Sequence, residues 1–162
     1  AGAWTSPRKV HDDQWIMPAC PVNGPAVTAR GMQAWVAWYT AAGDVPLLRI
    51  AHSSDAGDGF GKPVDLDRGE AVQGRAGIAV EGESVWVSWV REDAQGQSLW
   101  LARYPRDLSR ELQRLQVASL QGRGRATGFP QLVAGQGGVY MTWTDVIDGK
   151  PQLRGARITT SP

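Results

Sequence analysis

An internal repeat constrains the fold of this 162-residue chain more than any other feature of its sequence. Three segments align with one another without a gap: residues 25–51, 76–102 and 130–156. Their starts are 51 and then 54 residues apart, and tryptophan recurs in the same column at Trp38, Trp89 and Trp143. A repeat of this length indicates one structural unit built three times.

The repeated unit reads as short strands that are apolar on both faces. In the run AWVAWY, Ala34, Val36 and Trp38 alternate with Trp35, Ala37 and Tyr39, and VWVSWV and VYMTWT follow the same pattern. A sheet of such strands must be covered on both sides. A flat sandwich would leave one face polar, and a helical solenoid would need a 3.6-residue period. We therefore predict an all-β fold, a β-propeller of four-stranded antiparallel blades, of which this chain forms one partial propeller (residues 1–162) with about three blades.

The positions of the strands follow from the first repeat. From the innermost to the outermost strand, we expect residues 25–28, 34–39, 46–52 and 63–67. In the second repeat, the segment YPRDLSREL is expected to form a turn that leads into an outer strand at 115–118.

Composition excludes several classes of protein. Lys and Arg number 17 against 16 Asp and Glu, so no nucleic-acid footprint is expected. No apolar run is long enough to span a bilayer, and the first residues hold no signal-peptide core. Cys20 is the single cysteine, which excludes an internal disulfide, and neither His11 nor His52 has a second ligand at metal spacing. We expect no metal and no cofactor.

The stretch HSSDAGDGF concentrates small and acidic residues between two expected strands. Ser53 and Asp55 can hydrogen-bond the backbone of their own turn, Gly57 can take a positive φ, and Phe60 can anchor the hairpin. A calcium loop would need further oxygen ligands ending in a Glu, and none follows Phe60. We favour a structural turn over a catalytic acid at Asp55.

These four residues fit the pattern S-x-D-x-G-x-x-(W/F), which resembles the Asp-box, or BNR repeat, of the sialidase superfamily. With FGKPV (60–64), CPVNGPAV (20–27) and the W-x-x-P-x-x-V of residues 4–10, the whole chain resembles bacterial sialidase-like proteins. The resemblance implies a secreted or periplasmic protein whose Asp-box lies on the face away from the pocket. It is incomplete, because the chain has one full Asp-box and lacks the Arg-Ile-Pro signature of active sialidases.

The two ends of the chain do not complete the expected blades. Trp4-Thr-Ser-Pro7 matches Phe60-Gly-Lys-Pro63 in spacing, so residues 1–10 are expected to be an outer strand that completes a blade of a complementing half. The count is then twelve strands, three blades, or half of a six-bladed ring. The partner is either a second polypeptide, such as the rest of a longer chain, or a second copy of this one. Cys20 could form a disulfide with such a partner or be a buried thiol.

The loops at the pocket end supply the candidate functional residues. These are His11, Asp12, Asp13, Asn23, Tyr39, Glu70, Arg75, Arg91, Glu92, Asp93, Arg123, Arg125, Asp145 and Asp148. A sialidase needs arginines for the substrate carboxylate, a Tyr nucleophile activated by a Glu, and an acid/base Asp. The arginines 75, 123 and 125, with the pair Glu70 and Tyr39, are the weak catalytic candidates, and Asn23, Arg91 and Asp145 are pocket-face candidates. The alternative for each is solvated surface charge or, for Tyr39, packing.

Two functions follow from these observations. The first is an extracytoplasmic module that binds a glycan or another small ligand, or acts as a scaffold, without hydrolysis. The second is an exo-sialidase-type glycoside hydrolase whose active site is shared with the missing half. We favour the first, because no motif fixes a catalytic residue.

Overall fold

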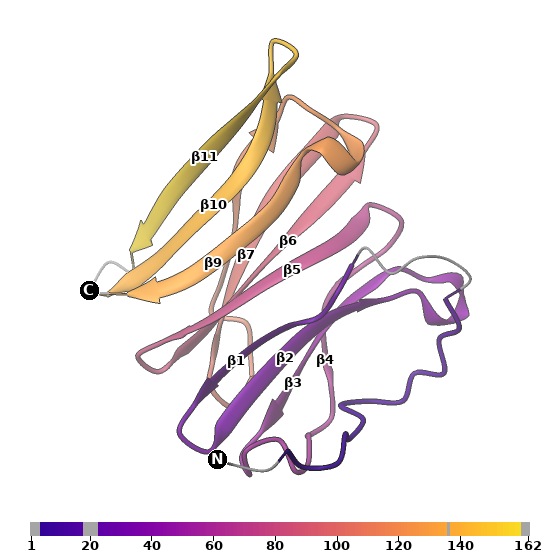
Figure 1. Cartoon of the computed structure of the whole chain (residues 1–162), viewed down its shortest axis with the longest axis vertical. Coiled ribbons are helices and arrows are strands. Elements are labelled where there is room, and N and C mark those ends of the chain that lie inside the picture. The colour runs from indigo at the N-terminus through magenta and orange to yellow at the C-terminus, as the bar shows by residue number, and fades with distance from the viewer. Residues whose placement is uncertain (1–3, 18–22, 136, 160–162) are drawn as a thin grey trace.

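A computed structural model describes residues 4–17, 23–135 and 137–159, which contain eleven strands in three antiparallel sheets (Figure 1). The first sheet comprises β1 (Ala26–Arg30), β2 (Gln33–Thr40), β3 (Leu47–Ser53) and β4 (Val64–Arg68). The second comprises β5 (Val72–Glu81), β6 (Ser84–Asp93), β7 (Gly96–Pro105) and β8 (Gln113–Leu120). The third comprises β9 (Gly128–Gly135), β10 (Gly138–Ile147) and β11 (Lys150–Thr159). Two short 3-10 turns, η1 (Ala42–Asp44) and η2 (Gly124–Ala126), interrupt the loops.

Each sheet is a meander whose strands follow one another in chain order. The strands lie where the repeat predicts them, and the outer strand of the second sheet extends to both sides of 115–118. The repeat also reproduces an irregularity. The third and fourth strands shift register between Leu48 and Arg49 in the first sheet and between the equivalent Leu99 and Trp100 in the second.

The three sheets stand face to face, and β5 lies between β1 and β9 (Figure 1). Strand β6 shows why both faces of a strand are apolar. Val87 and Trp89 are buried against the first sheet, whereas Trp86 and Val90 are buried against the third. The predicted cover on both sides is therefore present for the central sheet.

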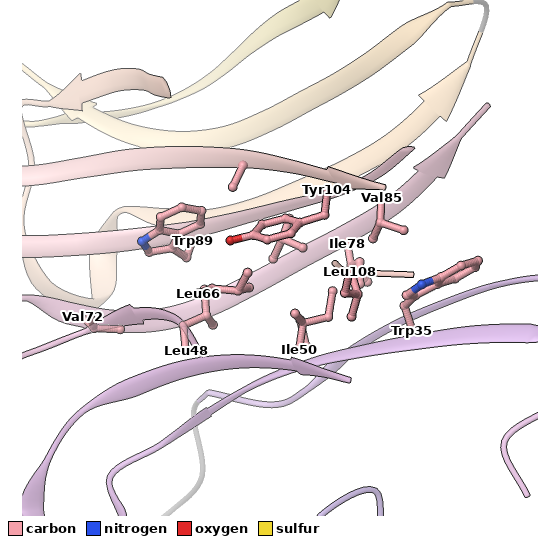
Figure 2. Close-up of a cluster of buried hydrophobic side chains, with 13 residues drawn as sticks. Trp35, Leu48, Ile50, Leu66, Val72, Ile78, Val85, Trp89, Tyr104 and Leu108 are labelled. Carbon is pink, nitrogen blue, oxygen red and sulfur yellow. The ribbon is translucent and has the colours of Figure 1, made fainter. Parts of the chain in front are cut away.

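The main core fills the space between the first and second sheets (Figure 2). Trp35, Leu48 and Ile50 from the first sheet meet Val85 and Trp89 from the second, and all five are completely buried. Each such side chain contributes about 1.5–3 kcal/mol relative to an exposed one. A hydrogen bond of 2.8 Å from Trp35 Nε1 to the carbonyl of Arg106 ties the far ends of the two sheets together.

A buried carboxylate joins the same two sheets near their other end. Asp67, on β4, accepts a hydrogen bond of 2.7 Å from Trp89 Nε1 and bonds of 2.6 and 2.7 Å from Arg91 Nη1, both on β6. Arg91 is thus an interaction partner within the fold.

The count of strands differs from the expected twelve because residues 4–17 form no strand. The third sheet has three strands, and no fourth strand lies beside β11 among the described residues. A strand forms only with a partner, so the predicted role of residues 1–10 in a complementing sheet concerns an assembly and stays a prediction. The prediction for Cys20 lies outside the described residues.

Candidate functional site

Two inner strands begin with an unusual backbone. Gly74 and Arg75 at the start of β5, and Gly128 and Phe129 at the start of β9, occupy the same two positions of the repeat. All four have positive φ, with 53° at Arg75 and 52° at Phe129. Residues other than glycine rarely have positive φ, so the backbone is strained at Arg75 and Phe129, and strain of this kind is often found at ligand sites. The ladder between β5 and β6 shifts register around Gly74, which gives a local bulge.

The bulges bring Arg75 and Phe129 together. The guanidinium carbon of Arg75 lies 4.6 Å from the centre of the Phe129 ring, and Arg75 Nη1 donates a hydrogen bond of 2.7 Å to the Thr127 carbonyl. Phe129 remains 44% exposed. Burial lowers the pKa of Arg75, Glu92 opposes this effect, and the charge of Arg125 adds to it.

A buried polar network holds this pair in place. Thr127 and Gln97 are buried, and the Thr127 hydroxyl donates to Gln97 Oε1 at 2.5 Å. Gln97 Nε2 donates to Glu92 Oε2 at 2.8 Å and to the Gly124 carbonyl at 3.3 Å. The Gly124 N–H in turn donates to Glu92 Oε2 at 3.2 Å. A satisfied buried network of this kind fixes a local geometry.

Tyr39 extends the site toward the first sheet. A Cβ atom added to Gly74 would lie 2.8 Å from the Tyr39 Cβ, so Tyr39 packs directly on the Gly74 backbone. The Trp15 ring meets the Tyr39 ring edge-on, with 5.7 Å between centroids. We call Trp15, Tyr39, Arg75 and Phe129 the inner-strand row: Trp15 meets Tyr39, Tyr39 packs on Gly74 at the start of the inner strand β5, and Arg75 of β5 stacks on Phe129 of the inner strand β9.

A groove of about 360 Å³ lies beside this row. Its lining includes Trp15, Asn23, Trp38 and Tyr39. Asn23 Oδ1 is buried and has no hydrogen-bond partner among the described residues. The groove therefore combines aromatic surface with a side chain whose buried carbonyl oxygen has no partner among the described residues, and small-ligand sites usually combine aromatic surface with a few polar groups.

Most carboxylates near the row already accept hydrogen bonds from the protein. Glu92 belongs to the polar network, and Asp145 accepts from the backbone N–H groups of Gln121 and Gly122, each at 3.1 Å. Asp93 accepts from the N–H groups of its own turn. Glu70 and Asp148 are exposed, and within the described chain neither has a hydrogen bond or an ion pair.

The remaining predicted arginines are placed apart from the row's ring contacts. Arg123 is exposed and donates hydrogen bonds of 2.9 Å to the carbonyls of Asp93 and Ala94, which caps the β6–β7 turn. Arg125 is exposed and reaches Arg75 only through its charge. Of the catalytic candidates, Tyr39 and Arg75 belong to the row: Tyr39 packs on Gly74, the residue before Arg75, and Arg75 stacks on Phe129.

The β3–β4 turn lies at the opposite end of the first sheet, since Ser53 pairs with Ala34 whereas Tyr39 pairs with Leu48. The Ser53 hydroxyl donates to Asp55 Oδ1 at 2.7 Å and accepts from the Gly57 N–H at 2.9 Å. A hydrogen bond from Ser53, then one from the backbone N–H of residue 59, lowers the pKa of Asp55.

The other residues of this turn serve its shape. Gly57 has a φ of 93°, and Phe60 is half-buried. The Gly61 N–H donates to the His52 carbonyl at 2.9 Å, which closes the loop. The equivalent loop of the second sheet closes in the same way, from the Leu112 N–H to the Arg103 carbonyl at 2.8 Å. This geometry is that of a turn, remote from the inner-strand row.

Sequence reasoning missed Phe129, Trp15, Gln97 and Thr127. A signal for the first was present, because Gly128-Phe129 repeats Gly74-Arg75 in the alignment. No three or more His, Cys, Asp or Glu side chains gather into a possible metal site in the described parts of the chain. Nor does any helix described here have the length and apolar character to cross a membrane.

Comparison with solved structures decides the fold. The chain is similar to the GH43 endo-arabinanase from Bacillus licheniformis, with a TM-score of 0.54 and 14% identity over 84% of this chain and 51% of that one. A thermostable family-43 glycoside hydrolase gives a TM-score of 0.58 and 14% identity over 84% and 50% of the two chains. These neighbours are five-bladed β-propellers. The fold is that of part of a β-propeller.

The propeller neighbours support the predicted fold but do not identify the sialidase family. An endo-arabinase from Bacteroides thetaiotaomicron also matches, with a TM-score of 0.54 and 16% identity over 82% of this chain and 55% of that one. This propeller chain spans about half the length of these structures. No protein-family model and no curated protein matches the sequence. The predicted propeller is confirmed, whereas the sialidase resemblance and the six-bladed count stay predictions.

Proposed function

We propose that this protein is a sialidase-like, carbohydrate-binding propeller module that acts outside the cytoplasm and holds a sugar against the inner-strand row without hydrolysing it. The observation that carries the proposal is the stack of Arg75 on the exposed ring of Phe129, on two strained and repeated bulges. The neighbouring propellers, titled as arabinanases and glycoside hydrolases, support a carbohydrate ligand.

The row has the chemistry that a sugar ring requires. One face of a pyranose or furanose carries C–H groups, which pack on the negative face of an aromatic ring, and its edges carry hydroxyl groups. Phe129 offers the exposed ring, and Arg75 offers a guanidinium group stacked on it. Strain at Arg75 and Phe129 holds these groups in place before a ligand arrives, which reduces the entropy lost on binding.

The same geometry argues against hydrolysis by this chain. Glycosidases generally need two carboxyl groups that flank the scissile bond, or a Tyr nucleophile activated by a Glu. The carboxylates of the half-buried Glu92 and the buried Asp145 already accept hydrogen bonds from groups within the protein. Burial raises the pKa of Tyr39, which keeps its phenol protonated, and no Glu hydrogen-bonds it among the described residues.

The test is a titration of the protein with two kinds of sugar, arabinan oligosaccharides and N-acetylneuraminic acid, followed by calorimetry or NMR. We expect binding of at least one kind, with an affinity reduced about tenfold or more in Arg75→Ala, since a hydrogen bond to a charged group contributes about 1.5–3 kcal/mol. Phe129→Ala should also weaken binding, because it removes the ring on which the sugar packs. The control is Arg110→Ala, an exposed arginine in the β7–β8 turn at the far end. Absence of binding to both sugars refutes the binding function. Turnover of a fluorogenic sialoside that Tyr39→Phe abolishes would establish the hydrolase instead.

A further inference from the structure

We propose that two copies of this chain associate head to tail, with the third sheet of each copy packed on the first sheet of the other. The inference does not depend on the sugar site. It rests on the two outward faces of the three-sheet stack and on the placement of residues 4–17.

Within the described chain, no sheet covers the outward face of the third sheet, whereas the corresponding face of the second sheet is covered by the third. Leu153 is 79% exposed and Val133 is 61% exposed. The residues at the same repeat positions of the second sheet, Leu99 and Ala79, are 0% and 4% exposed because the third sheet packs on them. The third sheet thus presents the same apolar positions with no sheet against them.

The outward face of the first sheet is the matching surface. Val27 on β1 is 69% exposed, whereas its counterpart Ile78 on β5 is 7% exposed because the first sheet covers it. Val36 and Trp38 occupy the positions that Val87 and Trp89 hold in the junction between the first and second sheets. The two outward faces of one chain therefore repeat the two halves of a junction that the same chain already forms internally.

Residues 4–17 lie on the first sheet as β4 lies on the second. Asp67 on β4 accepts hydrogen bonds from Trp89 and Arg91. Asp13 lies at the equivalent place: it lines one groove with Trp38, the counterpart of Trp89, and accepts the Trp15 N–H at 3.2 Å. Burial raises the pKa of Asp13, and interactions with Thr40, the Trp15 N–H and Trp38 lower it below its usual value. The N-terminal segment thus occupies the place of an outermost strand that belongs to a preceding sheet.

A second copy supplies that preceding sheet. Among the described residues, its β11 is a third strand with no strand on its outer edge. The segment that begins Trp4-Thr-Ser-Pro7 has the spacing that precedes β4 at Phe60-Gly-Lys-Pro63. The N-terminal segment of one copy adds to β11 of the other, and the exchange is reciprocal. In the pair of chains, this packing removes the two free β11 edges and covers all four outward apolar faces.

The test is the mass of the full chain in solution, measured by light scattering or sedimentation from about 1 to 100 μM. We expect twice the 17.5 kDa of the chain for the natural sequence. Leu153→Asp should shift the mass to that of one chain, and because the side chain is already exposed, circular dichroism should show an intact fold. Leu112→Asp changes an exposed leucine in the β7–β8 turn and should leave the mass doubled.

Three results would overturn the proposal. One is a single-chain mass for the natural sequence at every concentration, as expected if further blades of a longer polypeptide cover these faces. Another is a doubled mass that Leu153→Asp leaves unchanged. The last is a mass that grows steadily with concentration, because a head-to-tail contact that does not close gives open polymers.

Discussion

Replacing Asp67 with alanine should weaken the junction between the first and second sheets far more than the same replacement of Asp65, an exposed aspartate on the same strand. The Asp67 carboxylate accepts the indole N–H of Trp89, which is completely buried, at 2.7 Å and is paired with Arg91 at 2.6 Å. Its side chain is 7% exposed. Removing it leaves the buried indole N–H of Trp89 without a partner. It also leaves the charge of Arg91, which is partly shielded from water, without its counter-charge.

The expected cost follows from these two losses. A buried donor left unsatisfied costs about 1–3 kcal/mol. The Arg91 side chain is 29% exposed and can recover part of its hydration. Losing the Arg91–Asp67 ion pair should therefore cost about 1 kcal/mol, as for a surface pair, rather than the larger cost of breaking a fully buried pair. Together they give about 2–4 kcal/mol, or a fall in Tm on the order of 10 °C for a chain of this length.

The control is Asp65→Ala, two residues away on the same strand. Asp65 also pairs with an arginine, Arg49, at 2.8 Å, but its side chain is 44% exposed, so its loss should cost under about 1 kcal/mol. Urea titrations of both variants, followed by tryptophan fluorescence, give the two free energies of unfolding. Equal costs for the two variants, within about 0.5 kcal/mol, would refute the reasoning, because burial and the Trp89 bond would then contribute nothing.

Two further predictions concern the site and the second sheet. Gly74→Ala should lower the free energy of unfolding by about 1–3 kcal/mol more than Gly82→Ala. Both glycines have positive φ, but a Cβ atom at Gly74 would lie 2.8 Å from Tyr39, whereas one at Gly82 would meet no atom within 4 Å. Thermal melts of the two variants measure this difference, and their sugar affinities show its effect on the site. Burial, followed by the 2.8 Å hydrogen bond to Glu111, raises the pKa of Tyr104, so the stability that its neutral phenol provides is complete below about pH 10 and is lost as the pH rises above that value. Urea midpoints measured from pH 8 to 11 should fall for the natural sequence and stay more nearly level for Tyr104→Phe, whereas parallel curves would contradict the assignment.

The sequence predicts the sheets well because the evidence for them is local and repeated. Alternating apolar residues on both faces of residues 34–39 require cover on both sides, and the alignment of Trp38, Trp89 and Trp143 fixes the period. The structure follows these positions down to the repeated register shift at Leu48 and Leu99. Local pattern and global fold agree, as expected for a sequence that specifies one structure.

The site was predicted less completely, because its geometry arises from contacts between sheets. Tyr39 and Arg75 were identified by residue type and loop position, and the structure packs Tyr39 on Gly74, the residue before Arg75, while Arg75 stacks on Phe129. Gln97 and Thr127 lie 30 positions apart in the chain and meet only where the second and third sheets join. No pattern within one repeat reports that pairing, so it was not available from the sequence.

The charged candidates show why residue type alone misdirects the search for a site. Arg91 and Asp145 occupy the same position of the repeat, and both are bound within the protein: Arg91 donates to Asp67, and Asp145 accepts from Gln121 and Gly122. The two blade junctions thus use opposite charges for the same structural task. A charge at this position secures a junction, and its partners saturate its hydrogen bonds. Phe129 differs, since its neighbours fix its position and still leave its ring open to solvent, and a group that is both held and unsatisfied is what a ligand can use.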